Sequence, residues 1–398
     1  MSAREYDAVV IGGGMSGITA SLTLVSRGLT VALISRGDPV CCLSTGCIDV
    51  LGVNGPPLEA LSDLPDDHPY RLVGKKAVKE ALASFLSVMD EAGLPYAGAP
   101  GRNRKILTPI GSMKTTCLVP HTMVHADVPA EEHLRVISFA GLKDFFPGYI
   151  TSRFRNSECS VFDAGVSTTM GIAELFDEEP FVETFISWLK KLELHHDRLA
   201  IPAVLGMNDP GSVIERISQA TGRKVFEIPT LPPSVPGLRL FRAMKRVMRN
   251  RGVHLYWGKE VASVECLGSR VEAVTLETPG RASRVQGRAF ILATGSFVSG
   301  GLFAGRTSVR ETVFGLPMAV PAERRDWFDT DFFSGCHALE RSGIRVDAEF
   351  RPEGTRLENL FACGSILAGC EIMRRRCGHG LAIATGAAAA ESCARELT

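Results

Sequence analysis

The sequence predicts an α/β protein with a Rossmann-like fold and an inserted α/β domain. An apolar, β-branched run at residues 6–11 enters the glycine turn of residues 12–17, and a second buried run at 289–295 also ends in glycine. Between them, strand and helix patterns alternate over residues 133–230. Strands that alternate with helices imply a small parallel sheet, so this middle segment is predicted to be the inserted domain.

The N-terminal segment has the size of a dinucleotide-binding βαβ unit. Its first strand is followed by a helix at 18–27 and a second strand at 29–35. In the turn between strand and helix, Gly12 permits the tight bend, Gly14 lets a pyrophosphate approach the backbone, and Gly17 lets the helix pack closely on the sheet. The positive end of the helix attracts phosphate charge. The alternative is a structural turn that binds no ligand.

Apolar spacing predicts the other elements. Residues 50–75 are rich in Pro, Asp and Gly and are expected to form a loop, while 96–130 are expected to hold a few short strands. Helices are predicted at 77–92, 142–154, 181–192, 213–220, 238–251 and 380–397, and strands at 134–139, 199–205, 224–228, 253–257, 261–266, 271–276 and 360–364. The strands between 253 and 276 are expected to pair with one another.

These elements divide into three regions. A discontinuous cofactor-binding domain is predicted from residues 1–75, 253–300 and 350–398, and a strand-containing cap or substrate region from 76–132 and 301–349. The inserted α/β domain is predicted at 133–252.

Composition excludes several classes of function. The 398 residues carry 44 Lys plus Arg and 44 Asp plus Glu, so no charge excess favours nucleic acid as a partner. The N-terminus runs directly into a strand without a signal peptide, and no apolar stretch reaches the roughly 20 residues of a membrane span. The expected location is the cytoplasm, with any membrane contact made through another protein of a complex.

The cysteines are expected to be free thiols. There are eleven of them and no CxxC pair, which fits neither a disulfide framework nor a zinc site. The positions that need an explanation lie in two groups, Cys41, Cys42 and Cys47 near the N-terminus and Cys370 and Cys377 near the C-terminus. Their spacing matches no standard iron–sulfur run, so no metal is predicted.

Later segments favour a flavin over a nicotinamide cofactor. Ala293-Thr294-Gly295 resembles the second nucleotide-contact turn of two-dinucleotide-fold flavoproteins, and residues 358–365 resemble their C-terminal strand. This indicates an FAD/NAD(P)-binding flavoprotein fold. The dipole of the helix that begins near Gly378 would stabilise an anionic reduced flavin. The predicted cofactor-binding residues are Gly12, Gly14, Met15, Ser16, Gly17, Ser35, Arg36, Ser44, Thr45, Gly46, Ala293, Thr294, Gly295, Gly364, Ser365, Gly378, His379 and Gly380.

Two of these positions depart from the usual pattern. Ser35-Arg36 stands where a dinucleotide fold usually places an acidic residue for the adenosine ribose, and Ser365 stands where an acidic residue usually holds the ribityl chain. The motifs point to FAD, but the loss of the ribose-binding acid also fits FMN, which has no adenosine. For Ser44, Thr45 and Gly46 the alternative is an ordinary loop with local hydroxyl hydrogen bonds.

No catalytic residue follows from the pattern alone. His379 is a candidate for proton transfer, although its backbone is the more expected contact. Arg374, in the run Arg374-Arg375-Arg376, and Arg306 with Arg310 are candidate phosphate ligands. The alternative for these arginines is a solvated basic surface.

The chain resembles the B subunit of anaerobic glycerol-3-phosphate dehydrogenase. The resemblance rests on the Gly12 turn, the segments 43–49, 230–240 and 293–302, and the C-terminal motifs Asn359-Leu360-Phe361-Ala362-Cys363-Gly364-Ser365 and Cys377-Gly378-His379-Gly380. It covers most of the chain, and the inserted domain matches loosely.

The resemblance implies a flavoprotein subunit, assigned FMN in that family, which works with two partners, the catalytic flavoprotein (A) and the iron–sulfur protein (C) of the complex. The complex oxidises sn-glycerol 3-phosphate to dihydroxyacetone phosphate and passes electrons to quinone at the cytoplasmic face of the inner membrane. The alternatives are another fumarate-reductase-like or amine-oxidising flavoenzyme, or a scaffold protein without flavin.

Overall fold

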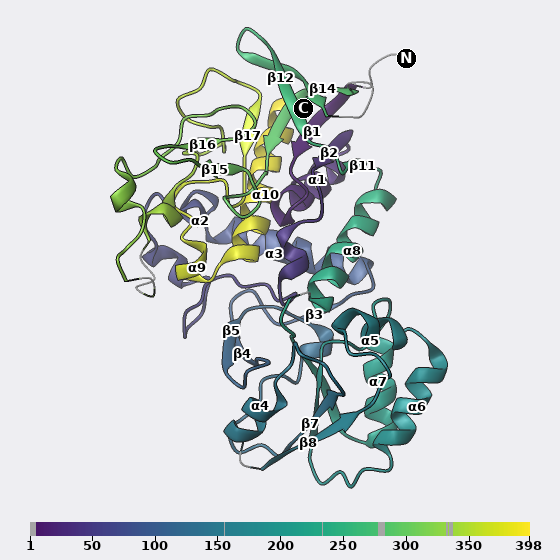
Figure 1. Cartoon of the computed structure of the whole chain (residues 1–398). Coiled ribbons are helices and arrows are strands. Elements are labelled where there is room, and N and C mark those ends of the chain that lie inside the picture. The colour runs from purple at the N-terminus through teal and green to yellow at the C-terminus, as the bar shows by residue number, and fades with distance from the viewer. Residues whose placement is uncertain (1–4, 155, 233, 278–282, 332, 334–336) are drawn as a thin grey trace.

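The computed structural model describes residues 5–154, 156–232, 234–277, 283–331, 333 and 337–398, so Pro233 of the 230–240 segment and Cys336 lie outside the described residues. Two sheets organise the chain, one in the upper and one in the lower part of the view in Figure 1. Each sheet has its own hydrophobic core.

The larger sheet has seven strands. Its order is β11 (His254–Trp257), β2 (Val31–Ser35), β1 (Glu5–Ile11), β14 (Ser283–Leu292), β13 (Arg270–Leu276) and β12 (Val261–Leu267), and β17 (Leu360–Ala362) pairs with β14. The strands β11, β2, β1, β14 and β17 run parallel, whereas β12 and β13 are antiparallel to their neighbours. Parallel strands end at one edge of a sheet, so the segments that follow β1, β14 and β17 meet there.

The helices of the first core are α1 (Met15–Ser26), α2 (Pro69–Val73), α3 (Lys75–Glu91), α8 (Val235–Asn250), α9 (Ile372–Arg375) and α10 (Gly378–Leu397). The two helices α1 and α10 cross closely, since a Cβ on Gly386 of α10 would lie 2.4 Å from the carbonyl oxygen of Ser16. Helix α8 falls within the range expected for the inserted domain, yet Leu240, Phe241 and Met244 pack into the first core.

The smaller sheet is entirely parallel, as predicted. Its order is β10 (Lys224–Ile228), β9 (Arg198–Pro202), β7 (Leu134–Phe139) and β8 (Ser157–Phe162). The helices α4 (Pro147–Arg153), α5 (Thr169–Leu175), α6 (Glu179–Leu189) and α7 (Pro210–Thr221) accompany it. Phe139, Phe162, Phe176 and Phe185 pack edge to face or stacked in its core.

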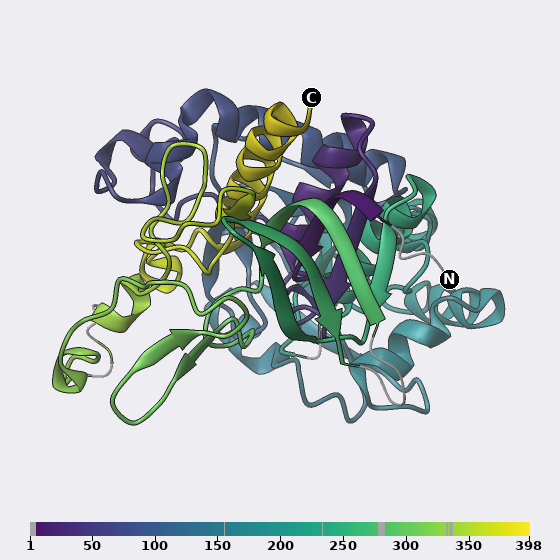
Figure 2. The same ribbon diagram turned by 90° about the horizontal axis from the view of Figure 1, so that it is seen from above.

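In the part of the chain that the structure describes, three short strand pairs and five 3-10 turns complete the fold. The pairs are β3 (Tyr96–Ala97) with β6 (Val119–Pro120), β4 (Arg104–Leu107) with β5 (Met113–Thr116), and β15 (Leu302–Ala304) with β16 (Val309–Glu311). The 3-10 turns are η1 (Val40–Leu43), η2 (Ala60–Asp63), η3 (His121–Met123), η4 (Arg324–Asp326) and η5 (Ala338–Arg341). Seen from above, the β15–β16 hairpin projects from the body of the molecule (Figure 2).

Three predictions of local structure were wrong, and two elements were missed. The helix expected at 142–154 begins only at Pro147, which fits the first turn of a helix because it has no N–H to lose. The expected loop at 50–75 contains η2 and α2, and strand β8 and helix α5 were not predicted. Strand β11 does not pair within 253–276 but lies parallel to β2, a contact between residues far apart in the chain.

Candidate functional site

The glycine turn between β1 and α1 has the shape of an anion site. Gly12 has a φ of +122°, and a Cβ there would lie 2.1 Å from the carbonyl oxygen of Ala293. A Cβ on Gly17 would lie 1.9 Å from the oxygen of Gly12, whereas a Cβ on Gly14 would meet no atom of the described residues within 4 Å. Among those residues, no side chain caps the N-terminus of α1 and no acidic residue stands in its first turn. The backbone N–H groups at the start of α1 therefore have no capping side chain in this part of the chain, which leaves them for an anion such as phosphate.

A second turn lies beside the first. The N–H of Ala293 donates to the oxygen of Ile11 at 2.8 Å, and Gly295 has a φ of +79°. The hydroxyl oxygen of Thr294 is buried and has no hydrogen-bond partner in the described part of the chain. Such an atom costs free energy unless a bound group satisfies it, so Thr294 fits a cofactor contact.

The C-terminal turn joins these two. Gly364 has a φ of +83°, a Cβ there would lie 2.3 Å from the Ser16 hydroxyl oxygen, and its N–H donates to the Thr385 hydroxyl of α10 at 3.0 Å. The Ser365 hydroxyl oxygen lies 3.4 Å from the position of a Cβ on Gly295. The structure thus brings together predicted residues from three distant segments, 12–17, 293–295 and 364–365.

The end of β2 has a different chemistry from the usual acidic residue. The Ser35 hydroxyl donates to the oxygen of Gly37 at 2.8 Å. The exposed Arg36 guanidinium donates to the oxygen of Ser299 at 3.2 Å and pairs with Glu260 at 3.6 Å, so it spans from β2 toward the second turn.

Sequence reasoning missed Trp257, whose ring would touch a Cβ on Gly13 at 2.7 Å. The Lys245 ammonium lies 4.0 Å from the centre of this ring. The long-range pairing of β11 with β2 brings Trp257 to the glycine turn.

The loop after β2 contacts the start of α10. The ring nitrogen Nδ1 of His379 lies 3.0 Å from the carbonyl oxygen of Cys47, and the N–H of Gly380 donates to the oxygen of Asp49 at 3.0 Å. A Cβ on Gly380 would lie 2.7 Å from the Tyr70 hydroxyl oxygen, so this glycine permits a close approach. Gly378 begins α10 in the same turn.

Ser44, Thr45 and Gly46 have local and tertiary partners. The Ser44 hydroxyl donates to the oxygen of Cys41 at 2.7 Å and accepts from the N–H of Gly46 at 3.2 Å, which is the local turn expected as the alternative to ligand binding. The Tyr96 hydroxyl donates to the oxygen of Gly46 at 2.6 Å. The Thr45 hydroxyl oxygen accepts from Lys114 at 3.4 Å.

Lys114 and Asp49 form an ion pair that the sequence did not indicate. Their side chains are 28% and 21% exposed, and the Lys114 ammonium nitrogen lies 2.8 Å from Oδ2 of Asp49. Burial opposes the charge of Lys114, but the neighbouring Cys47 and Asp49 outweigh it and raise the pKa of the ammonium. The signal was absent because strand β5 carries Lys114 to the 44–49 loop from an unrelated part of the sequence.

The predicted arginines separate in the structure. Arg374 and Arg375 both pair with the buried carboxylate of Glu371, at 2.9 Å and 3.1 Å. Arg306 is exposed in the loop of the β15–β16 hairpin, where its carbonyl oxygen accepts from Arg324. Arg376, beside the start of α10, is therefore the arginine of this run that forms no ion pair with Glu371 in the described part of the chain.

The cysteines of both groups are free. Burial raises the pKa of the Cys47 thiol and brings that of Cys370 to about 12, so both are protonated at neutral pH. Among the described residues, no three His, Cys, Asp or Glu side chains gather as a metal site would require.

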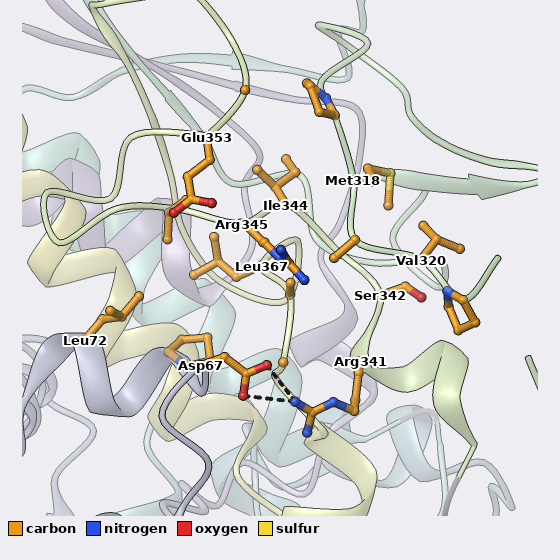
Figure 3. A pocket seen from close by; sticks show the side chains of 18 of the residues that line it. Asp67, Leu72, Met318, Val320, Arg341, Ser342, Ile344, Arg345, Glu353 and Leu367 are labelled. Carbon is orange, nitrogen blue, oxygen red and sulfur yellow. Dashed lines mark hydrogen bonds and ion pairs between the residues drawn. The ribbon is translucent and has the colours of Figure 1, made fainter.

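A large cavity of about 780 Å³ lies between α2 and the segments 317–321 and 338–346, and residues 367–369, just after the C-terminal turn, also line it. Asp67 and Arg341 form an ion pair of 2.7 Å at its wall, below Arg345 and Leu367 in the view of Figure 3. None of the predicted cofactor residues, all of which the structure describes, lines it. The backbone turns, rather than this cavity, therefore define the candidate cofactor site.

Comparison with known proteins shows the family of the chain. A family described as FAD binding domain matches residues 7–381. A protein of Vibrio cholerae named as the B subunit of anaerobic glycerol-3-phosphate dehydrogenase is 29% identical over 97% of this chain and 96% of its own length. A protein of Halobacterium salinarum with the same name, marked probable, is 31% identical over 99% of both chains.

Among solved structures, a mutant of E. coli quinol fumarate reductase FrdA is 9% identical, with a TM-score of 0.48 over 100% of this chain and 71% of that one. Across the described residues, no helix has both the length and the apolar character needed to cross a membrane.

Proposed function

The chain belongs to the FAD binding domain family and to the B-subunit family of anaerobic glycerol-3-phosphate dehydrogenase, and from this premise we propose that it is the flavin-carrying subunit of a glycerol-3-phosphate:quinone dehydrogenase complex. The observation that carries the proposal is a similarity over almost the whole length of chains named as this subunit, together with three glycine turns that lie against one another.

FAD is the cofactor for which the matching FAD binding domain family is described, and the residues at the site fit it. The glycine turn at the start of α1 would hold its pyrophosphate, and Thr294 has an unsatisfied hydroxyl to offer. When bound, FAD would supply an acceptor for two electrons, taken up together as a hydride or one at a time. The N-terminus of α10 would lie toward the flavin ring and favour negative charge on it.

The proposed partners are the catalytic flavoprotein (A) and the iron–sulfur protein (C) of the complex. The relatives' name, which makes them one subunit of several, supports a complex, and the resemblance supports these two members. In the proposed pathway, electrons from sn-glycerol 3-phosphate pass through the complex to quinone and dihydroxyacetone phosphate is released. The complex lies at the cytoplasmic face of the inner membrane, and this chain reaches the membrane through its partners.

The test begins with the visible spectrum of the purified full-length chain. We expect flavin absorbance, and we expect chromatography of the released cofactor to identify FAD; release of FMN would correct the cofactor and keep the flavoprotein function. A colourless protein that takes up neither cofactor would leave only a scaffold role.

The second step adds sn-glycerol 3-phosphate to the complex reconstituted from this chain, the catalytic flavoprotein, the iron–sulfur protein and a quinone. We expect the flavin of this chain to be reduced and reoxidised in the presence of quinone. Quinone reduction that continues unchanged when this chain is replaced by its flavin-free form would contradict the proposed electron transfer.

A further inference from the structure

We propose that this chain has its own oxidation site for a small anionic alcohol, formed by Lys114, Arg376 and His379 at the start of α10, toward which the flavin ring is proposed to lie. The resemblance assigns catalysis to the partner flavoprotein, so this site would be additional. The inference rests on the proposed function to the extent that the alcohol needs a bound flavin as hydride acceptor.

The hydrogen bond of His379 decides which ring nitrogen can accept a proton. A carbonyl oxygen only accepts hydrogen bonds, so Nδ1, 3.0 Å from the oxygen of Cys47, must carry the ring proton. The lone pair of the neutral ring is therefore on Nε2. No residue in the described part of the chain hydrogen-bonds Nε2, which leaves it available to a substrate hydroxyl.

The surroundings keep this imidazole neutral. Burial is the largest cause and lowers the pKa of His379, the hydrogen bond to Cys47 and the charge of Asp49 oppose it, and the charge of Lys114 adds to it. Tyr70 of α2, which reaches the same turn next to Gly380, has a pKa raised well above its ordinary value by burial and so brings no charge. A neutral imidazole is the form that acts as a general base.

Lys114 provides a cation with unused hydrogen-bonding capacity. Its ammonium has three N–H donors, and two acceptors are in place, Oδ2 of Asp49 at 2.8 Å and the hydroxyl oxygen of Thr45 at 3.4 Å. Within the described ranges no third acceptor is found. At this half-buried position the electrostatic attraction between an anion and the Lys114 ammonium is stronger than it would be in open solvent.

Arg376 adds a second positive charge. It has a φ of +50°, in the left-handed region that is unusual for an arginine, and its side-chain stem lies over Gly52, where a Cβ would be 2.7 Å from Cβ of Arg376. The positive charge of Arg376 repels that of Lys114 and so opposes the rise in the pKa of the Lys114 ammonium. Within the described ranges Arg376 forms no ion pair, unlike Arg374 and Arg375.

Together, two cations and one carboxylate leave a net positive charge beside a neutral base. This combination suits a small alcohol that carries a phosphate or carboxylate group. In the reaction, Nε2 of His379 would take the hydroxyl proton. A bound flavin would supply the acceptor for the hydride of the carbinol C–H bond, so that the alcohol would become a carbonyl compound. The anionic group of the substrate stays paired with Lys114 and Arg376.

The experiment uses the full-length, flavin-loaded chain without its partners and three probes: sn-glycerol 3-phosphate, inorganic phosphate and glycerol. Binding is followed by the shift of the flavin spectrum, and oxidation by flavin bleaching without oxygen. We expect both phosphate-containing probes to shift the spectrum, glycerol to have no effect at the same concentration, and sn-glycerol 3-phosphate to bleach the flavin.

Two variants separate binding from proton transfer. Lys114→Met should raise the apparent Kd for both phosphate-containing probes by about tenfold or more, because a charged hydrogen-bond donor is lost. Lys105→Met, at an exposed lysine on the neighbouring strand β4, is the control and should leave this Kd unchanged. His379→Asn keeps an N–H for the Cys47 oxygen but has no basic nitrogen, so it should slow bleaching by about 10²- to 10⁴-fold with little change in Kd.

The pH profile adds an independent readout. In the wild type the bleaching rate should fall as the pH drops through the lowered pKa of His379, and in His379→Asn this fall should disappear. Three results would overturn the inference: no bleaching by sn-glycerol 3-phosphate without partners, an unchanged Kd in Lys114→Met, or an unchanged rate in His379→Asn. Failure of the proposed function would look different from failure of this inference. It would show as a purified chain that binds no flavin, or as a complex that reduces quinone equally well when this chain carries no flavin.

Discussion

Gly14 and Gly17 lie three residues apart in the same turn, but a methyl group would meet different surroundings at each. At Gly14, which has a φ of −76°, a Cβ would project into space that holds no atom of the described residues within 4 Å. We predict that Gly14→Ala folds normally, with stability within about 1 kcal/mol of wild type, and loses flavin because the methyl group occupies the phosphate position. The measurements are visible absorbance after purification and urea unfolding of the flavin-free protein.

Gly17→Ala is the matched contrast. Its Cβ would lie 1.9 Å from the carbonyl oxygen of Gly12, so the backbone must shift, at a cost of about 1–3 kcal/mol in the free energy of unfolding. If Gly14→Ala retained its full flavin content, the phosphate group would have to bind elsewhere than at this turn.

The predictability of the site differs from residue to residue for a physical reason. Gly12, Gly14 and Gly17 were predicted because their spacing itself creates the turn, and a local pattern records it. Tertiary contacts bring in the other residues. Strand β5 carries Lys114 to Asp49, and the pairing of β11 with β2 brings Trp257 to the glycine turn. Single-sequence patterns contain no signal for such contacts, and Arg374 was misleading because Glu371 satisfies it.

At the scale of elements, α2 shows why a short helix escapes sequence analysis. It has five residues, too few for a periodic apolar pattern, and its neighbours are typical loop residues. His68 precedes it as the N-cap, with Nδ1 accepting from the N–H of Tyr70 at 3.2 Å and the two rings stacked. A histidine is an uncommon N-cap, so the usual start signal was missing.

His68 makes the stability of this region depend on pH. Burial is the main cause that lowers its pKa from 6.5 to about 4. In the unfolded chain the ring takes up a proton below pH 6.5, whereas the folded ring does so only near pH 4, so stability is full above pH 6.5 and is lost as the pH falls between these values. The loss should reach about 3 kcal/mol.

His68→Asn tests this prediction. Asparagine is a good N-cap and does not titrate, so the variant should be somewhat less stable at pH 7, because ring packing is lost, and should show a weaker loss of stability on acidification. Urea unfolding at several pH values between 7 and 4 provides the comparison. Parallel pH profiles for the two proteins would mean that other groups cause the acid sensitivity.

At the scale of the whole molecule, the predicted α/β flavoprotein fold is confirmed, and so is the second, parallel sheet. Both follow from alternating strand and helix patterns that lie within short stretches of chain. The position of α8 does not, because its apolar residues are consistent with packing on either sheet. The structure shows that α8 packs into the first core while Val235 at its start belongs to the second, so this helix connects the two units.

A buried ion pair holds α8 to the second sheet. Glu227 of β10 is 0% exposed and Arg239 of α8 is 3% exposed, and they are joined by two hydrogen bonds of 2.6 Å and 3.0 Å. Arg239 also donates to the oxygen of Gly206, and Glu227 accepts from the N–H of Leu205. Every charged atom of the pair is therefore satisfied only when the two units are docked.

We predict that Arg239→Met lowers the free energy of unfolding by about 3–5 kcal/mol, because it leaves the Glu227 carboxylate buried without its cation. Adding Glu227→Leu should restore part of this loss, since the double variant buries no charge, although the N–H of Leu205 then loses its acceptor.

Arg216→Met is the control: Arg216 pairs with Glu179 and Glu183 at the surface, so its loss should cost about 1 kcal/mol or less. Urea unfolding followed separately by flavin release and, in a Trp257→Phe/Trp327→Phe background, by the fluorescence of Trp188 near the second core would show whether the units part before they unfold. Equal effects of Arg239→Met and Arg216→Met would mean that apolar packing of α8, rather than this ion pair, holds the two units together.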